Sequence, residues 1–159
     1  MNRTFKELIK MKENISLEER IQRLEDIEAI KKLQAIYGHY VDKGWNGKEV
    51  NFAELPTLFT EDATWESEAM KVNVKGINNI IDMLKKATAH GELGMHSFTN
   101  PIIDINGDSA TGKYLLWVGV KGGGVTNLVY QSEDVVYLRT TSGWKIKGIK
   151  LYFAQLLNS

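Results

Sequence analysis

The second half of the chain constrains the fold most, because it consists of strand-like segments separated by tight-turn signals. Asn106-Gly107 is a favoured two-residue hairpin turn, and glycine-containing turns also occur at residues 122–124 and 141–143. These turns separate four segments: Met95 to Ile105, Ala110 to Lys121, Leu128 to Thr140 and Trp144 to Phe153. Strands joined by such short connections run antiparallel, so this half predicts a meander.

The first half of the chain predicts helices instead. Ser16 to Glu19 has the capping-box pattern, and apolar residues then recur at three- and four-residue steps as far as Tyr40. This helix is expected to end near Lys43-Gly44. A short strand at Asp62 to Glu68 precedes a second amphipathic helix, from Gly76 to about His90. Helices first and a meander last indicate an α+β domain whose helices pack on one sheet face.

Length and composition favour one domain, with an N-terminal arm at residues 1–15 and the folded unit at 16–159. Lys plus Arg number 20 and Asp plus Glu number 20, a balance that argues against a nucleic-acid partner. The absence of cysteine excludes disulfides, thiolate metal sites and cysteine nucleophiles. Because no long apolar run or signal peptide is visible, we expect a cytoplasmic protein with no membrane partner.

The chemistry has few candidate residues, and His96 is the first of them. It lies near the start of a predicted strand, where alternation places His96, Phe98 and Asn100 on one face. A histidine on an inward face can act as a general base. The alternative is a core histidine that hydrogen-bonds a backbone carbonyl.

Asp42 and Tyr37 are the other two candidates. Asp42 lies at the end of the long helix, where the helix dipole disfavours a carboxylate, so it predicts a partner such as His96. The alternative is a solvated turn residue. Tyr37 could offer a phenolic hydroxyl to a pocket shared with His96 and Asp42. The five-residue spacing, however, places Tyr37 about 140° from Asp42 around a regular helix. It could equally be a core aromatic residue.

These residues resemble the SnoaL-like family, within the nuclear-transport-factor-like (cystatin-like) fold. The similarity spans roughly residues 17–155, and its motifs are loose, so their order and spacing carry it. They are Asp26 to Leu33, Tyr37, Asp42, Leu58 to Trp65, Gly76, Met95 to Asn100, Asn106-Gly107 and Gly143 to Ile146. The resemblance implies a cone in which N-terminal helices pack on a curved, mostly antiparallel sheet and enclose one pocket.

The resemblance also implies an activity. The family includes scytalone dehydratase and bile-acid dehydratases, in which an Asp–His dyad removes a proton while a hydroxyl or halide leaves, without metal or cofactor. It therefore implies that Asp42 and His96 form that dyad and that Tyr37 matches a pocket tyrosine. The pocket is expected to be lined by aromatic and mixed side chains: Phe59, Trp65, Phe98, Asn100, Tyr114 and Val118.

Two departures from the family pattern keep two functions open. Val118 stands where the bile-acid enzymes carry a second carboxylate, and the last strand offers no clear basic residue, since Lys150 serves only if the register shifts. We therefore expect either a cofactor-independent lyase (dehydratase-like) or isomerase acting on a small hydrophobic cyclic substrate, or a non-catalytic binding or accessory protein. A purely structural role is a third option. We expect a homo-oligomer formed through the sheet face around Leu128 to Leu138, with a trimer favoured and a dimer possible.

Overall fold

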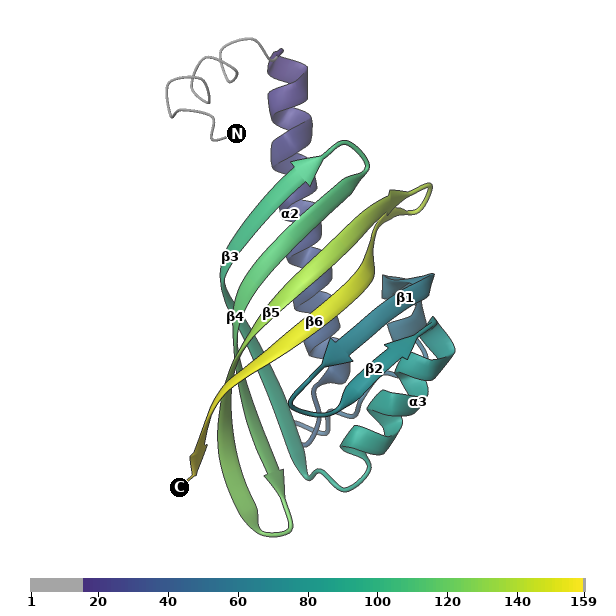
Figure 1. The fold of residues 1–159 in the computed structure, drawn as a ribbon. Coiled ribbons are helices and arrows are strands. Elements are labelled where there is room, and N and C mark those ends of the chain that lie inside the picture. The colour runs from purple at the N-terminus through teal and green to yellow at the C-terminus, as the bar shows by residue number, and fades with distance from the viewer. Residues whose placement is uncertain (1–15, 159) are drawn as a thin grey trace.

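The computed structural model describes residues 16–158, and the predicted arm at residues 1–15 lies outside them. The described part contains two α-helices, one short 3-10 helix and one six-stranded sheet (Figure 1). The helices are α2 (Leu17–Val41), η1 (Leu55–Leu58) and α3 (Ile77–Thr88). The strands are β1 (Phe59–Ser67), β2 (Val72–Lys75), β3 (Leu93–Asn106), β4 (Ser109–Gly122), β5 (Val125–Thr140) and β6 (Gly143–Asn158).

The sheet has the strand order β2-β1-β6-β5-β4-β3. The predicted meander is confirmed, because β3 to β6 pair consecutively and antiparallel. The last strand, β6, also pairs in parallel with β1, so the sheet is mixed. The four long meander strands form one end of the sheet, and the short strands β1 and β2 form the other. The short edge strand β2 was not predicted from the sequence.

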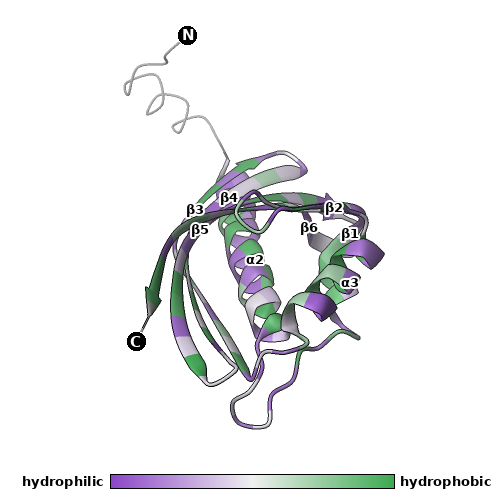
Figure 2. Ribbon diagram, turned by 60° about the horizontal axis from the view of Figure 1, so that its bottom comes forward, coloured by the Kyte–Doolittle hydropathy of each residue, from purple (hydrophilic) through white to green (hydrophobic). Residues whose placement is uncertain are grey.

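Both helices lie on one face of the curved sheet, as the α+β prediction required (Figure 2). The capping box at the start of α2 is present, with Glu19 N–H donating to Ser16 Oγ at 3.1 Å and Ser16 N–H donating to Glu19 Oε2 at 2.8 Å. The first turns of α2 extend beyond the sheet (Figure 1), and their apolar residues Leu17 and Leu24 are exposed.

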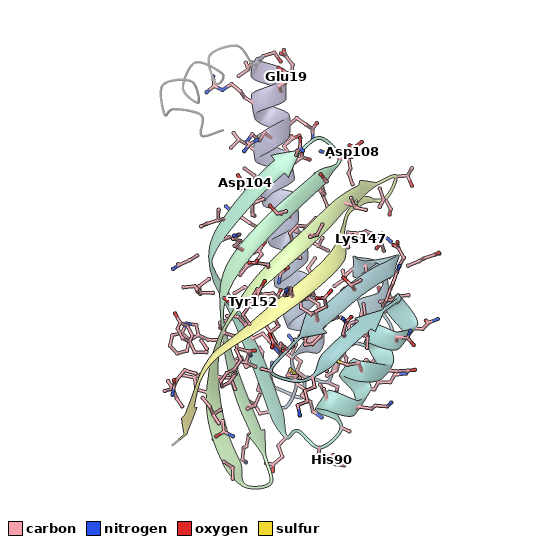
Figure 3. All side chains as sticks on the ribbon, in the orientation of Figure 1. Glu19, His90, Asp104, Asp108, Lys147 and Tyr152 are labelled. Atoms are coloured by element: carbon pink, nitrogen blue, oxygen red, sulfur yellow. The ribbon has the colours of Figure 1, made fainter. Side chains whose placement is uncertain are left out.

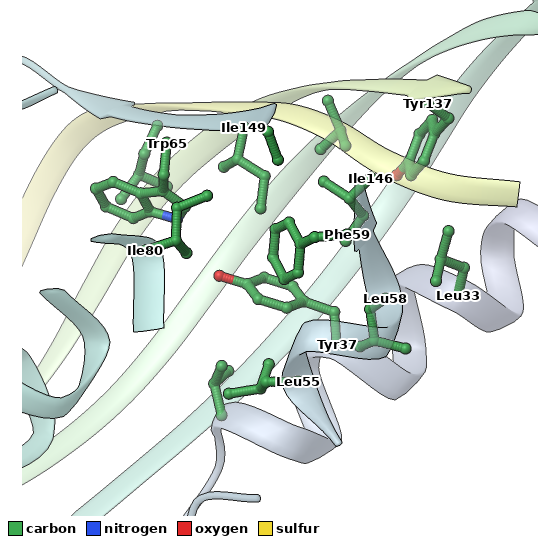
Figure 4. Close-up of a cluster of buried hydrophobic side chains, with 14 of the residues drawn as sticks. Leu33, Tyr37, Leu55, Leu58, Phe59, Trp65, Ile80, Tyr137, Ile146 and Ile149 are labelled. Carbon is green, nitrogen blue, oxygen red and sulfur yellow. The ribbon is translucent and has the colours of Figure 1, made fainter. Parts of the chain in front are cut away.

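The core fills the space between the helices and the concave face of the sheet (Figure 4). From α2, the ring of Tyr37 packs edge-on against Phe59 of β1, with ring centroids 5.7 Å apart. Leu55 of η1 and Ile80 of α3 are fully buried in the same cluster. Burial of each such side chain contributes about 1.5–3 kcal/mol, so the helices are held mainly by this apolar contact.

A partly buried ion pair fixes the middle of α2 to the β5–β6 hairpin. Arg139 donates two hydrogen bonds to Asp26, from Nη1 at 2.7 Å and Nη2 at 2.6 Å, and Trp144 Nε1 donates a third at 3.0 Å. The guanidinium of Arg139 holds the pKa of Asp26 down to about 2. Arg139 also reaches Asp108 on the β3–β4 turn, at 3.2 Å (Figure 3). This clamp sets how α2 lies across the sheet.

Within residues 16–158, no helix has the length and apolar character that crossing a membrane requires.

Candidate active site

The end of α2 is joined to the start of β3. The helix stops at Val41, and Lys43 and Gly94 form an isolated bridge in which each N–H donates to the other's carbonyl, at 2.9 and 3.1 Å. Gly44 turns the chain away with φ of 88°, and a Cβ there would lie 1.9 Å from the carbonyl oxygen of Glu92. This junction carries Asp42, the residue after the helix, to the strand that holds His96.

Asp42 and His96 form a hydrogen-bonded pair. Oδ1 of Asp42 accepts from His96 Nδ1 at 2.9 Å and from the His96 backbone N–H at 2.8 Å. Asp42 is 3% exposed, whereas the His96 side chain is 24% exposed. Because Nδ1 donates to the carboxylate, Nε2 is the ring nitrogen left with a lone pair in neutral histidine. Nε2 has no hydrogen-bond partner in the described part of the chain.

A cavity of about 850 Å³ lies between the helices and the concave strands. Tyr37 and His96 both line it, and most of the remaining wall is apolar, including Met83, Leu116 and Val129. A smaller groove of about 310 Å³ lies between α2 and β3 and is lined by Asp42 and His96 among others. His96 therefore forms part of the wall of both, with its carboxylate partner on the groove side.

Tyr37 reaches the large cavity from α2. Its hydroxyl has no hydrogen-bond partner among residues 16–158, and burial raises its pKa, with nearby Glu133 adding to the rise. The indole N–H of Trp65 lies near the phenolic oxygen, close enough to offset part of that rise but without hydrogen-bond alignment (Figure 4). Tyr37 and Asp42 point in different directions from the helix, and they lie on opposite sides of His96. Tyr37 lines the large cavity, and Asp42 lines the small groove.

The other expected pocket residues divide among three places. Trp65 and Val118 line the large cavity, and Phe98 and Tyr114 line the small groove. Phe59 is buried against Tyr37 in the core and lines neither space.

Asn100 also lies away from both spaces, exposed and with φ of 50°. The pairing of β3 with β4 shifts between Thr99 and Ile102, so the strict alternation assumed from the sequence ends just before Asn100. Close packing does hold Phe98 against the helix, where a Cβ on Gly38 would lie 2.9 Å from the Phe98 ring.

The sequence analysis missed Glu133, a buried carboxyl group on β5 that lines the large cavity. Burial raises its pKa to about 8, although the hydrogen bond from Gln34 partly opposes the rise. The signal was present in the sequence, since Glu133, Val135 and Tyr137 alternate on one strand face and the last two are plainly core residues. Val118 on β4 stands where a second carboxylate was expected from the family pattern. The described structure instead has a carboxyl group on the neighbouring strand β5, that of Glu133, in the same cavity.

Two helices on the concave face of a curved sheet, with an apolar cavity between them and the strands, are typical of the NTF2-like class with a cystatin-like fold. A crystal structure of such a protein from Novosphingobium aromaticivorans superposes with a TM-score of 0.70 at 24% identity, over 87% of this chain and 88% of that chain. More specifically, a family model of the SnoaL-like domain matches residues 22–150. The chain belongs to the SnoaL-like family.

Two further crystal structures share the fold. A proposed scytalone dehydratase from Novosphingobium aromaticivorans has a TM-score of 0.75 and 16% identity, over 86% of this chain and 89% of that one. The hexachlorocyclohexane dehydrochlorinase LinA-type3 from Novosphingobium barchaimii has a TM-score of 0.75 and 19% identity, over 88% and 94%. Identities this low establish the fold alone. No curated protein matches the chain.

Proposed function

We propose that the protein is a cofactor-independent lyase of the dehydratase type, or an isomerase, acting on a small hydrophobic cyclic substrate. The observation that carries the proposal is the Asp42–His96 pair, which leaves Nε2 without a partner in the described part of the chain, at the wall of an apolar cavity. The fold shared with a proposed scytalone dehydratase and with a dehydrochlorinase supports the same reaction class.

His96 is the general base in this mechanism. Nε2 takes a proton from a ring carbon, the C–H electron pair forms a new C=C bond, and the leaving group departs with the electrons of its own bond. The buried carboxylate of Asp42 holds the ring in the required tautomer and stabilises the imidazolium that forms. An isomerase would return the proton to another carbon of the same substrate.

Tyr37 serves as a hydrogen-bond donor. Its raised pKa keeps the phenol protonated at neutral pH, and its hydroxyl has no hydrogen-bond partner among residues 16–158. A substrate oxygen that gains negative charge as the proton leaves would be stabilised there. The cavity volume of about 850 Å³ and its apolar walls suit a ring system.

A non-catalytic binding or accessory protein is the second candidate, and the inner face of β6 favours it. Its inward positions hold Ile149 and Leu151, and Lys150 is exposed. The described part of β6 therefore presents no cation to the substrate where related enzymes present one.

The test is a ligand screen with matched variants. Wild type, His96→Gln and the control His39→Gln, an exposed histidine on α2, are screened by thermal shift against hydroxylated and halogenated ring compounds. Mass spectrometry then follows loss of water or halide from each hit. The lyase proposal expects turnover by wild type and His39→Gln, and binding without turnover by His96→Gln. Binding without turnover by all three would support the second candidate instead.

We also propose a homo-oligomer, with a trimer favoured, in the cytoplasm. Apolar side chains such as Val136 and Tyr152 are exposed on the outer face of β5 and β6, where a second copy could cover them. Sedimentation should give a mass above the 18.0 kDa of the chain, and a monomer at micromolar concentration would contradict the proposal.

A further inference from the structure

Glu133 is held by a directed chain of hydrogen bonds. Tyr114 and Tyr137 share a bond of 2.9 Å between their hydroxyls, and Tyr137 donates to Gln34 Oε1 at 2.7 Å. Gln34 Nε2 then donates to Glu133 Oε1 at 2.7 Å. Because the Tyr137 proton is committed to Gln34, Tyr114 is the donor in the first bond, and all three bonds point toward Glu133.

These hydrogen bonds determine which oxygen of Glu133 would carry a proton. Oε1 already accepts a hydrogen bond, and Oε2 has no hydrogen-bond partner in the described part of the chain. A protonated carboxyl group therefore carries its hydrogen on Oε2 and can donate it to a molecule in the cavity that Glu133 lines.

The surroundings keep the carboxyl group neutral near pH 7. Glu133 is 3% exposed, and burial raises its pKa to about 8. The groups that face it from neighbouring elements are Gln34, Tyr37, Tyr114 and Tyr137. The same cavity is also lined by the titratable side chains of Lys43, His90, His96 and Lys121. No cation forms an ion pair with Glu133 among residues 16–158, and the hydrogen bond from Gln34 offsets only part of the cost of burying its charge.

The strand register places Glu133 and His96 at two ends of one face. On β4, Val118 pairs with His96 and Tyr114 pairs with Glu133. Those two rows are about 13 Å apart along the strand at about 3.3 Å per residue, and two strand spacings add about 10 Å sideways. Together these spacings put the two Cα atoms about 16 Å apart. Both side chains point inward, so their reactive atoms lie closer together than the Cα atoms do.

We propose that Glu133 is a second catalytic group, a neutral carboxylic acid that protonates an oxygen leaving group, so that the substrate class is hydroxylated rather than halogenated rings. The inference rests on the proposed lyase function. His96 Nε2 takes the proton from carbon, the C=C bond forms, the C–O bond breaks, and the proton on Glu133 Oε2 converts the departing hydroxide to water. Afterwards His96 holds one proton more and Glu133 one fewer, and solvent restores both.

A neutral acid matters for one leaving group and not for another. Hydroxide is a poor leaving group unless it is protonated as it departs, and general acid catalysis is worth about 10²- to 10⁴-fold in rate. Chloride leaves without a proton. The ratio of the two elimination rates on one ring skeleton therefore isolates the contribution of Glu133.

The experiment uses α-tetralone carrying either a hydroxyl or a chlorine on the carbon β to its carbonyl. Both lose their group to give fluorescent α-naphthol. Glu133→Gln is expected to lower the hydroxyl-to-chloride rate ratio by about 10²-fold or more. The control Asp134→Asn, at the next position on β5, should keep the ratio, and His96→Gln should slow both reactions. The wild-type ratio should also fall above about pH 8, as Glu133 ionises.

The outcomes separate the two proposals. A wild type that eliminates neither group contradicts the proposed function and the inference with it. A wild type that eliminates both, with Glu133→Gln slowing them equally, contradicts the inference alone and leaves Glu133 a structural residue. Infrared difference spectra of wild type against Glu133→Gln at neutral pH provide a check without substrate. They should show the C=O stretch of a protonated carboxylic acid, and a carboxylate band in its place would overturn the inference.

Discussion

Replacing Glu133 by Gln should stabilise the folded protein at neutral pH, in a way that depends on pH. The substitution keeps the shape of the side chain and an oxygen that can accept from Gln34, but it removes the ionisable group. The unfolded chain releases the Glu133 proton near pKa 4.5, whereas the folded protein holds it to about 8. Between these values the unfolded state binds fewer protons, so wild-type stability falls as the pH rises.

The size of the effect follows from the same two values. The penalty grows by about 1.4 kcal/mol per pH unit, reaching about 3 kcal/mol at about pH 7 and about 5 kcal/mol above about pH 8. Urea unfolding followed by tryptophan fluorescence should therefore show Glu133→Gln more stable than wild type at about pH 7 by about 3 kcal/mol, and equal to it at or below about pH 4.5.

The control is Asp134→Asn, which removes a carboxylate from the neighbouring, less buried position on β5. It should not reproduce the pH dependence. A Glu133→Gln variant whose stability tracks that of wild type at every pH would refute the reasoning, because it would mean that Glu133 is charged in the folded protein without a penalty.

Three further substitutions test other parts of the account. Asp42→Asn should lower elimination by about 10²- to 10⁴-fold in steady-state kinetics with the fold retained, because an amide stabilises an imidazolium poorly, and activity near wild type would refute the dyad. Gly44→Ala should lower stability by more than about 2 kcal/mol in a thermal melt, because its Cβ would meet the Glu92 carbonyl at a positive φ. Asp26→Ala should cost about 1–3 kcal/mol, because it removes two hydrogen bonds from Arg139 and leaves the buried Trp144 Nε1 without its acceptor, although Arg139 keeps its contact with Asp108. Wild type should keep the Asp26 contribution above its ordinary pKa of 3.8 and lose it as the pH falls toward about 2.

Much of the fold could be predicted from local signals. The turn near Asn106-Gly107, the capping box at Ser16 and the apolar period of the helices each act over a few residues. The capping box and both helices are present, the two loop residues of the turn are Gly107 and Asp108, and the apolar period faces the core only beyond Leu24. Strand β2 could not be predicted, because Val72–Lys75 is only four residues long and its pairing with β1 depends on tertiary contact. The exposed position of Asn100 arises from a register shift, which alternation alone cannot reveal.

A site residue could be predicted only where its type was unusual for its position in the sequence. Asp42 attracted notice because a carboxylate is disfavoured at a helix end, and the Lys43–Gly94 bridge explains how it reaches His96. Glu133 could not be singled out, because it lies in the polar run Gln131 to Asp134, which looks like a solvated stretch of the strand. Its burial depends on tertiary contact with Gln34 of α2, which lies 99 positions away in the chain. The cavity that it lines is likewise formed only when the helices pack on the sheet.

The central claim is that His96 removes a proton from a ring carbon, and hydrogen exchange tests it without a leaving group. Unsubstituted α-tetralone is incubated in heavy water with wild type, His96→Gln or His39→Gln, and mass spectrometry follows deuterium uptake at the carbon next to the carbonyl. Uptake above background is expected with wild type and His39→Gln, and background uptake with His96→Gln. Equal uptake by His96→Gln and wild type would contradict the claim.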